Sequence, residues 1–267
     1  MRSATCSCGA GPAAGACPAR DPSQRQAPGG NLRTVNHSAS AEPVLATLVV
    51  AIDGPSGSGK STVSRQVATR LGLRYLDTGA MYRALTWWML QHDIDVDNPG
   101  EIAAGAGKPV VEVGTDPAAP TVSVDGVDVS RPIRSRSVSN AVSAVSAVPA
   151  VRALMVAHQR EVIGSGGVVV EGRDIGTVVV PDAPVKVYLT ASSSTRAQRR
   201  TRELAHDPAT TLVLTATELD RRDRLDSGRA ASPLTRAPDA HELDTTALTP
   251  DEVLAAVLEL VRLRTGG

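Results

Sequence analysis

The 267-residue sequence contains no phenylalanine, only three lysines, and three cysteines that all fall within its first twenty residues. Because no cysteine follows Cys17, the rest of the chain forms no internal disulfide, which is typical of a reducing compartment. Cys6, Cys8 and Cys17 are also too few to supply the four ligands of a structural zinc site. These absences favour a cytoplasmic protein with no structural zinc.

Net charge and long apolar runs are lacking as well. The 28 acidic residues balance the 28 basic ones, so the composition gives no support for a nucleic-acid partner. No apolar run has the form of a signal peptide or the length that crosses a bilayer. We therefore expect no membrane and no nucleic acid among the partners. We also expect a monomer, although the sequence does not fix the oligomeric state.

Residues 1–44 have almost no large apolar side chains and are rich in Gly, Ala, Pro and Ser. Such a segment buries too little surface to offset the entropy lost on ordering. We predict a disordered tail over 1–44 and a folded domain over 45–267. Two alternatives stay open: a gene start assigned too far upstream, and a tail that docks.

Three short apolar runs predict buried parallel strands, at residues 48–52, 168–170 and 185–189. Helical spacing follows the first run up to Gly72, and a capping box at residues 249–252 begins the last helix. Strands that alternate with helices predict a three-layer α/β/α domain with a parallel sheet.

Residues 102–147 break this alternation. Valines at strand period flank Asp125 and Gly126, a pair typical of a hairpin turn, and a helical pattern follows them. We predict a small insert that begins with an antiparallel patch.

Residues 54–61, GPSGSGKS, match the phosphate-loop pattern GxxxxGK[ST] at every fixed position, between a predicted strand and a predicted helix. The glycines let successive backbone N–H groups point at phosphate oxygens, and the new helix adds its positive end. Lys60 would reach the β and γ phosphates, and Ser61 would ligate Mg²⁺. The motif predicts ATP or GTP but does not identify the acceptor. The predicted nucleotide-binding residues are Gly54, Pro55, Ser56, Gly57, Ser58, Gly59, Lys60, Ser61 and Thr62.

Three further motifs carry charge, and each has an ordinary alternative. LDTGAMYR, residues 76–83, would place Thr78 as a helix cap and Arg83 on that helix, where an arginine is usually just solvated. EGRDIG, residues 171–176, follows an apolar strand, where α/β sheets place ligands. Its acid and its Arg–Asp pair could also be surface groups. The arginine-dense stretch 221–229 could be a solvated helix face, and its interleaved aspartates and missing aromatics argue against nucleic acid.

Together these motifs resemble those of the bacterial cytidylate kinases, within the nucleoside monophosphate kinases, from about residue 47 to the C-terminus. The motifs that carry the resemblance are IDGPSGSGKST, LDTGAMYR, EGRDIGTVVVPDAPVKVYLTAS, RRDRLDSGRAASPL and residues 243–246, LDTT. The resemblance implies a P-loop kinase core. It also implies that the insert at about 102–147 binds the monophosphate and that residues of about 195–230 form a helical lid.

The resemblance also implies roles for single residues. The acceptor phosphate would be surrounded by Thr78, Tyr82, Arg83, Arg173 and Arg229. From the lid, Arg222 and Asp226 would contact the ribose or the phosphate. Ser143, Arg152 and Asp174 would face the cytosine, and Glu171 would orient Mg²⁺ through water. The residues that act on the transferred group would be Lys60, Arg173, Arg222 and Arg229. An alternative for Asp174 is that it only orients Arg173.

Two positions depart from the family pattern. Thr78 stands where many members have serine, and Leu225 stands where a charged residue is common. The implied reaction is ATP + (d)CMP ⇌ ADP + (d)CDP, with Mg²⁺ and direct in-line transfer. Another small-molecule P-loop kinase is one alternative. A nucleotide switch or a nucleic-acid-binding P-loop protein is a second, although the guanine-reading pattern Asn-Lys-x-Asp of a GTPase switch is absent.

Overall fold

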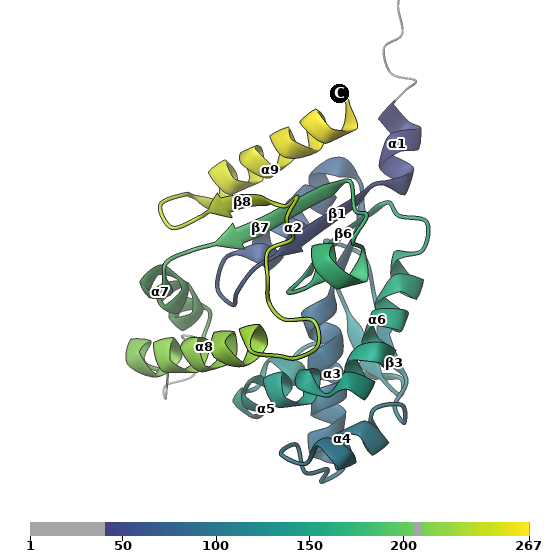
Figure 1. The fold of residues 1–267 in the computed structure, drawn as a ribbon, viewed down its shortest axis with the longest axis vertical. Helices are drawn as coiled ribbons and strands as arrows, with labels where there is room; N and C mark the ends of the chain where they lie inside the picture. The colour runs from purple at the N-terminus through teal and green to yellow at the C-terminus, as the bar shows by residue number, and fades with distance from the viewer. Residues whose placement is uncertain (1–40, 205–209, 267) are drawn as a thin grey trace, which may run out of the picture. The chain divides into compact units, whose positions relative to one another are not determined.

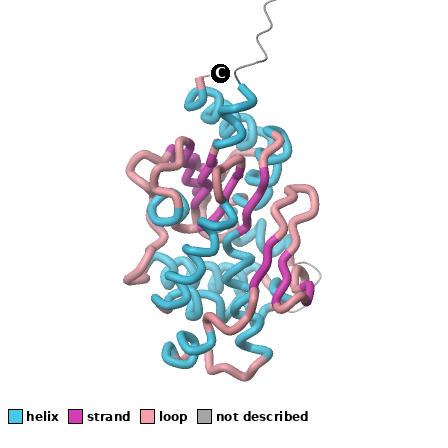
Figure 2. The backbone as a smooth tube through the Cα atoms, turned by 90° about the vertical axis from the view of Figure 1, so that its right-hand side faces the viewer, coloured by secondary structure: helices cyan, strands magenta, loops and turns pink. Residues whose placement is uncertain are grey.

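The protein, known here from a computed structural model, is described over residues 41–204 and 210–266. Its main sheet has five parallel strands in the order β2-β6-β1-β7-β8 (Figures 1 and 2). They are β1 (Val49–Asp53), β2 (Arg74–Asp77), β6 (Val168–Gly172), β7 (Val185–Thr190) and β8 (His241–Asp244). Every residue of β1 and β6 is buried, as continuous apolar runs predict.

Helices cover both faces of this sheet. On one face, α2 (Lys60–Leu71) and α9 (Pro250–Thr265) pack their valines against one set of inward side chains of β1, β6 and β7. On the other face, α3 (Thr78–Gln91) and α6 (Pro149–Ile163) pack against the alternate set. The predicted three-layer α/β/α core with a parallel sheet is therefore confirmed.

The segment between α3 and α6 contains a second sheet, antiparallel, in the order β3-β4-β5 (Figure 2). Its elements are α4 (Pro99–Gly105), β3 (Val111–Val113), β4 (Val122–Val124), β5 (Val127–Asp128), the turn η1 (Pro132–Arg134) and α5 (Arg136–Ala147). Asp125 and Gly126 have φ values of 51° and 79°, so the predicted hairpin turn is confirmed. Valines of β3 and β4 share one apolar core with α3, so this segment is packed onto the main sheet's helix layer.

Beyond β7 the chain forms α7 (Ser193–Glu203) and α8 (Leu212–Ser227), which pack against each other. Helix α8 also contacts α5 (Figure 1). These two helices fall within the segment predicted as a lid. The short helix η2 (Ile175–Val179) directly follows β6 and its loop.

Two of three predicted helix ends are confirmed. Thr249 and Glu252 form the reciprocal capping box, and Gly72 ends α2 in the left-handed conformation at φ 65°. The prediction that Thr78 caps α3 is wrong. Asp77 is the cap, because its Oδ1 accepts the Ala80 N–H at 2.9 Å, whereas the Thr78 hydroxyl donates to the Glu171 carbonyl at 2.7 Å.

In the described part of the chain, no single helix has the length and apolar character needed to cross a membrane. Helices α5 and α6 meet that test only as a pair, and the pair is bent by 96°.

Helix α1 (Ala41–Thr47) includes the last four residues of the predicted tail, while residues 1–40 lie outside the described residues. Leu45 packs against the core beside α2 and α9. Gly166 and Gly167 lie so close to α1 that a Cβ on Gly166 would be 2.2 Å from the Thr47 carbonyl oxygen. Leu45 and the backbone of Thr47 are therefore packed against the folded domain.

Removal of residues 1–40 should leave the melting temperature and activity nearly unchanged, whereas removal of residues 1–47 should lower the melting temperature. The second deletion exposes the surface that Leu45 half-covers, worth about 1 kcal/mol or about 2–4 °C for a domain of this size. Thermal denaturation followed by circular dichroism compares the two deletions with the full chain. A drop of several degrees on removing 1–40 alone would show that the tail docks.

Candidate active site

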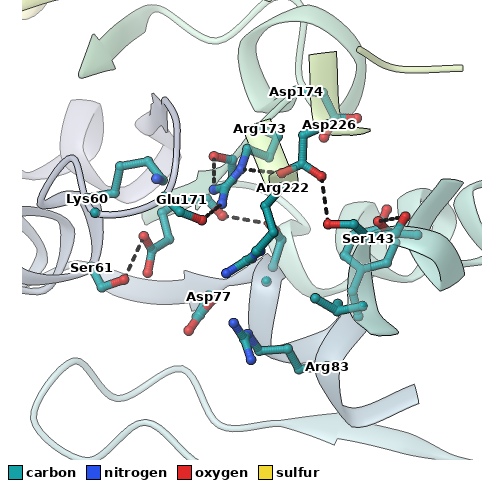
Figure 3. A pocket seen from close by; sticks show the side chains of 18 of the residues that line it. Lys60, Ser61, Asp77, Arg83, Ser143, Glu171, Arg173, Asp174, Arg222 and Asp226 are labelled. Carbon is teal, nitrogen blue, oxygen red and sulfur yellow. Dashed lines mark hydrogen bonds and ion pairs between the residues drawn. The ribbon is translucent and has the colours of Figure 1, made fainter. Parts of the chain in front are cut away.

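A pocket of about 1070 Å³, partly open to solvent, lies at the carboxyl ends of β2 and β6 and extends to α5 and α8. Figure 3 shows Lys60 and Ser61 at one end and Ser143 at the other, with Arg83 and Arg222 pointing into the space between. All ten predicted acceptor residues line this pocket: Thr78, Tyr82, Arg83, Ser143, Arg152, Arg173, Asp174, Arg222, Asp226 and Arg229. Six of the nine phosphate-loop residues line it too: Ser56, Gly57, Gly59, Lys60, Ser61 and Thr62.

The loop between β1 and α2 is fixed by contacts that only glycine permits. A Cβ on Gly54, which has φ 146°, would lie 2.1 Å from the Leu189 carbonyl oxygen of β7. Gly59 is left-handed at φ 92°, and α2 begins at the next residue. The N–H groups of the first helical turn therefore open toward the pocket, as an anion site requires.

Lys60 and Glu171 face this loop, and both are buried. The Lys60 ammonium donates to the Pro55 carbonyl at 2.6 Å. Burial, and then the charge of Arg173, lower the pKa of Lys60, while burial and the charge of Asp77 raise the pKa of Glu171. A phosphate beside Lys60 would supply the ion pair that this ammonium lacks among the described residues.

The residues present fit Mg²⁺. The Ser61 hydroxyl donates to Glu171 Oε2 at 3.0 Å, and Tyr75 donates to Glu171 Oε1. Nowhere in residues 41–204 and 210–266 do three or more His, Cys, Asp or Glu side chains gather as metal ligands. Mg²⁺ needs no such cage, because one or two carboxylates, water and substrate phosphates complete its shell. A hydroxyl beside a buried carboxylate is therefore an adequate donor set.

Most of the pocket's arginines are paired with carboxylates. The pairs are Arg134–Asp77 at 3.0 Å, Arg173–Asp226 at 3.1 Å, Arg200–Glu203 at 2.9 Å, Arg229–Asp226 at 4.0 Å, and Arg152–Asp174. In the described part of the chain, Lys60, Arg83 and Arg222 form no ion pair. Among residues 41–204 and 210–266, Arg83 donates only to the Ile133 carbonyl and the Ser139 hydroxyl, and the buried Nε of Arg222 has no hydrogen-bond partner.

These cations repel one another. Burial and the charge of Arg222 lower the pKa of Arg83, and burial and the charge of Arg173 lower the pKa of Arg222 to about 10. The pocket thus holds uncompensated positive charge where an anion with several negative charges would bind.

The far end of the pocket is built around Arg152 and Asp174, which form a buried ion pair. The Arg152 guanidinium also lies over the Tyr82 ring, 5.4 Å from its centre. Its Nε is buried and makes no hydrogen bond to any described residue. Asp174 does not pair with Arg173, which instead donates to Asp226 and to the Ser56 hydroxyl. The alternative that Asp174 only orients Arg173 is therefore wrong.

The predicted site residues did not include two acids, Asp53 and Asp77. Asp53, at the end of β1, accepts the backbone N–H groups of Ile175 and Gly176 at 2.9 and 2.8 Å. Burial raises its pKa to about 6. Asp77 lines the pocket and holds Arg134 of η1. Each acid directly precedes a motif residue, Gly54 or Thr78, at a strand's carboxyl end, and this position is the signal that would have found both.

The late motif LDTT also contacts the phosphate loop. The buried Thr245 hydroxyl lies 3.2 Å from the Ser58 carbonyl and 3.0 Å from the Thr190 carbonyl. Arg199 of α7 donates to that hydroxyl at 2.9 Å and to the Thr245 carbonyl at 2.7 Å. This motif therefore joins β7, α7 and the loop.

Comparison with known proteins agrees with this arrangement. The profile of the cytidylate kinase family matches residues 50–263. A cytidylate kinase of Streptomyces griseus is 55% identical over 226 residues, which cover 84% of this chain and 96% of that protein. One from Rhodococcus jostii is 54% identical over 222 residues, covering 82% and 96%, and one from Geobacillus thermodenitrificans is 46% identical over 220 residues, covering 82% and 98%. The chain belongs to the cytidylate kinase family.

Proposed function

We propose that this protein is a cytidylate kinase that transfers the γ-phosphoryl group of ATP to CMP or dCMP, giving ADP and CDP or dCDP. The observation that carries the proposal is a set of cations around one pocket, Lys60, Arg83 and Arg222, that have no ion pair with any residue the structure describes. That pocket runs from a phosphate loop to a buried Arg–Asp pair able to read a base. Family membership favours cytosine as that base.

Little covalent chemistry is needed from the side chains. The acceptor's phosphate dianion is itself the nucleophile, so no general base is required for attack on the γ-phosphorus. Lys60 would neutralise charge on the triphosphate, while Arg83 and Arg222 would hold the acceptor phosphate, with Arg173 and Arg229 beside them. Catalysis then consists of positioning and charge stabilisation in a site that excludes water.

We further propose Mg²⁺ as the cofactor, with Ser61 as a ligand and Glu171 oriented toward it through water. When bound, Mg²⁺ supplies additional charge neutralisation on the phosphates. The hydroxyl groups of Ser61 and Tyr75 donate to the two oxygens of Glu171. These hydrogen bonds favour the ionised form of Glu171 and fix the orientation of its carboxylate. The monomeric state and the cytoplasmic location stay predictions.

The direct test is product identification. ATP, CMP and Mg²⁺ incubated with the protein should give CDP and ADP in equal amounts, separated by ion-exchange chromatography. ADP without CDP would show that the protein hydrolyses ATP or phosphorylates something else, and would contradict the proposal.

Amide hydrogen exchange in α7 and α8 should slow when ATP and CMP are both bound. Arg222 and Arg83 carry like charges close together, and two sets of phosphates would neutralise them and favour closure of the lid. Mass-spectrometric exchange over residues 193–204 and 212–227 measures the effect, and α9, which contributes no residue to the pocket lining, is the internal control. Identical exchange with and without the two nucleotides would contradict a lid role.

A further inference from the structure

Two ion pairs connect helix α8 to a single residue of the phosphate loop, Ser56. Asp226 accepts from Arg173 at 3.1 Å, and Arg173 donates to the Ser56 hydroxyl at 2.7 Å. Asp223, one helical turn before Asp226, accepts from Arg196, and Arg196 donates to the Ser56 carbonyl at 3.1 Å. The two carboxylates of α8 thus hold the side chain and the backbone of the same loop residue.

The two connections differ in where they lie. Arg173 and Asp226 line the pocket, while the described residues that line it do not include Arg196 or Asp223. Arg196 is 6% exposed, and it also donates to the Ala191 carbonyl at 3.2 Å. It therefore reaches Ser56 from the body of the protein rather than from the ligand space.

The backbone of α7 also touches the loop at the next residue. A Cβ on Gly57, which has φ 77°, would lie 3.0 Å from the Arg196 carbonyl oxygen. Because the loop binds phosphate through its backbone N–H groups, a shift of Ser56 or Gly57 re-aims those groups. One nitrogen of the Arg196 guanidinium donates both to the Ser56 carbonyl of the loop and to the Asp223 carboxylate of α8. A movement of α8 would therefore also shift the loop backbone.

We propose that Arg196 and Asp223 are positioning residues, which couple the placement of α8 to the phosphate-binding shape of the loop. The inference rests on the proposed function only in taking ATP as the loop's ligand. The pair acts through Ser56 and without touching either nucleotide. Its loss should therefore weaken ATP binding more than CMP binding.

The test compares Asp223→Asn, Arg196→Gln and the double variant by isothermal titration calorimetry with ATP, and by KM for ATP and for CMP. Each single variant should raise the Kd and KM for ATP roughly tenfold, the expected effect of losing a charged hydrogen bond. The double variant should bind ATP no more weakly than the weaker-binding single variant, because both substitutions break the same connection. The KM for CMP should rise less than the KM for ATP, because the described residues that line the acceptor pocket include neither Arg196 nor Asp223.

Asp220→Asn is the matched control, because it makes the same charge change on the exposed side of α8. If the two variants changed ATP affinity only through their net charge, their effects would have opposite signs. Loss of a carboxylate near the loop would strengthen ATP binding, and loss of an arginine would weaken ATP binding. Tighter or unchanged ATP binding by Asp223→Asn would therefore overturn the proposal, as would equal rises of both KM values or additive effects.

Melting temperatures show whether each variant is folded. If Arg196→Gln does not fold, the comparison of Asp223→Asn with Asp220→Asn still tests the proposal. Calorimetry with ATP needs no acceptor, so the inference and the proposed function fail separately. Absence of CDP formation by the wild type would contradict only the function.

Discussion

Replacing Lys60 by alanine should leave the protein folded and lower kcat by roughly 10²-fold or more, as loss of a preorganised charge at the transferred group implies. Lys60 is the first residue of α2, where alanine is well tolerated, and its ammonium is buried against the Pro55 carbonyl. Because burial already disfavours this charge, its removal should not lower the free energy of unfolding. The effect should therefore appear in turnover alone.

The measurement is kcat at saturating ATP, with the melting temperature as the check on folding. Lys108→Ala is the control, since Lys108 is exposed and lies outside the pocket lining. Turnover of Lys60→Ala at the wild-type rate with ATP saturating would contradict the placement of the phosphate site.

Replacing Asp174 should change which base the enzyme accepts. Cytosine presents an amino donor and two ring acceptors, whereas uracil presents a carbonyl acceptor and an N–H donor at the corresponding positions. A carboxylate and an arginine that match cytosine would meet like groups on uracil. A site of this kind rejects the wrong base by up to about 10⁴-fold, because its buried polar groups lose their partners. Asp174 and Arg152 are the proposed pair, with Ser143 as a third contact.

Asp174→Ala should therefore raise the KM for CMP and narrow the ratio of kcat/KM between CMP and UMP. Because Asp174 also compensates the buried charge of Arg152, the same change should cost about 3–5 kcal/mol of stability. Asp174→Asn is the more informative variant, since it keeps the shape and adds an amide donor that suits uracil. An equal loss with both substrates, at an unchanged ratio, would show that Asp174 has only a structural role.

The sequence was sufficient for the core because the signals there are local. Apolar runs predicted β1, β6 and β7, and the Gly-rich motif between strand and helix predicted the loop and α2. Eight of the ten acceptor residues lie in the quoted motifs, and the family resemblance placed these eight together with Ser143 and Arg152 without any knowledge of distance. Each of these predictions depends on neighbouring residues in the chain.

The remaining features depend on packing between distant elements. Asp77 replaces Thr78 as the cap of α3 because the Thr78 hydroxyl is used by the Glu171 carbonyl, 93 residues away. Arg196 and Asp223 each read as solvated charges on separate helices. Their pairing, and their contact with Ser56, exist only once α7 and α8 lie against the loop. Such contacts cannot be predicted from the spacing of residues in the sequence.

The most direct test of the account is ADP release by the wild-type protein, with ATP and Mg²⁺, across a panel of nucleoside monophosphates at equal concentration. CMP and dCMP should stimulate ADP release strongly, and UMP, AMP and GMP should stimulate it weakly. ADP release that CMP does not stimulate, or that UMP or AMP stimulates as well as CMP does, would contradict it.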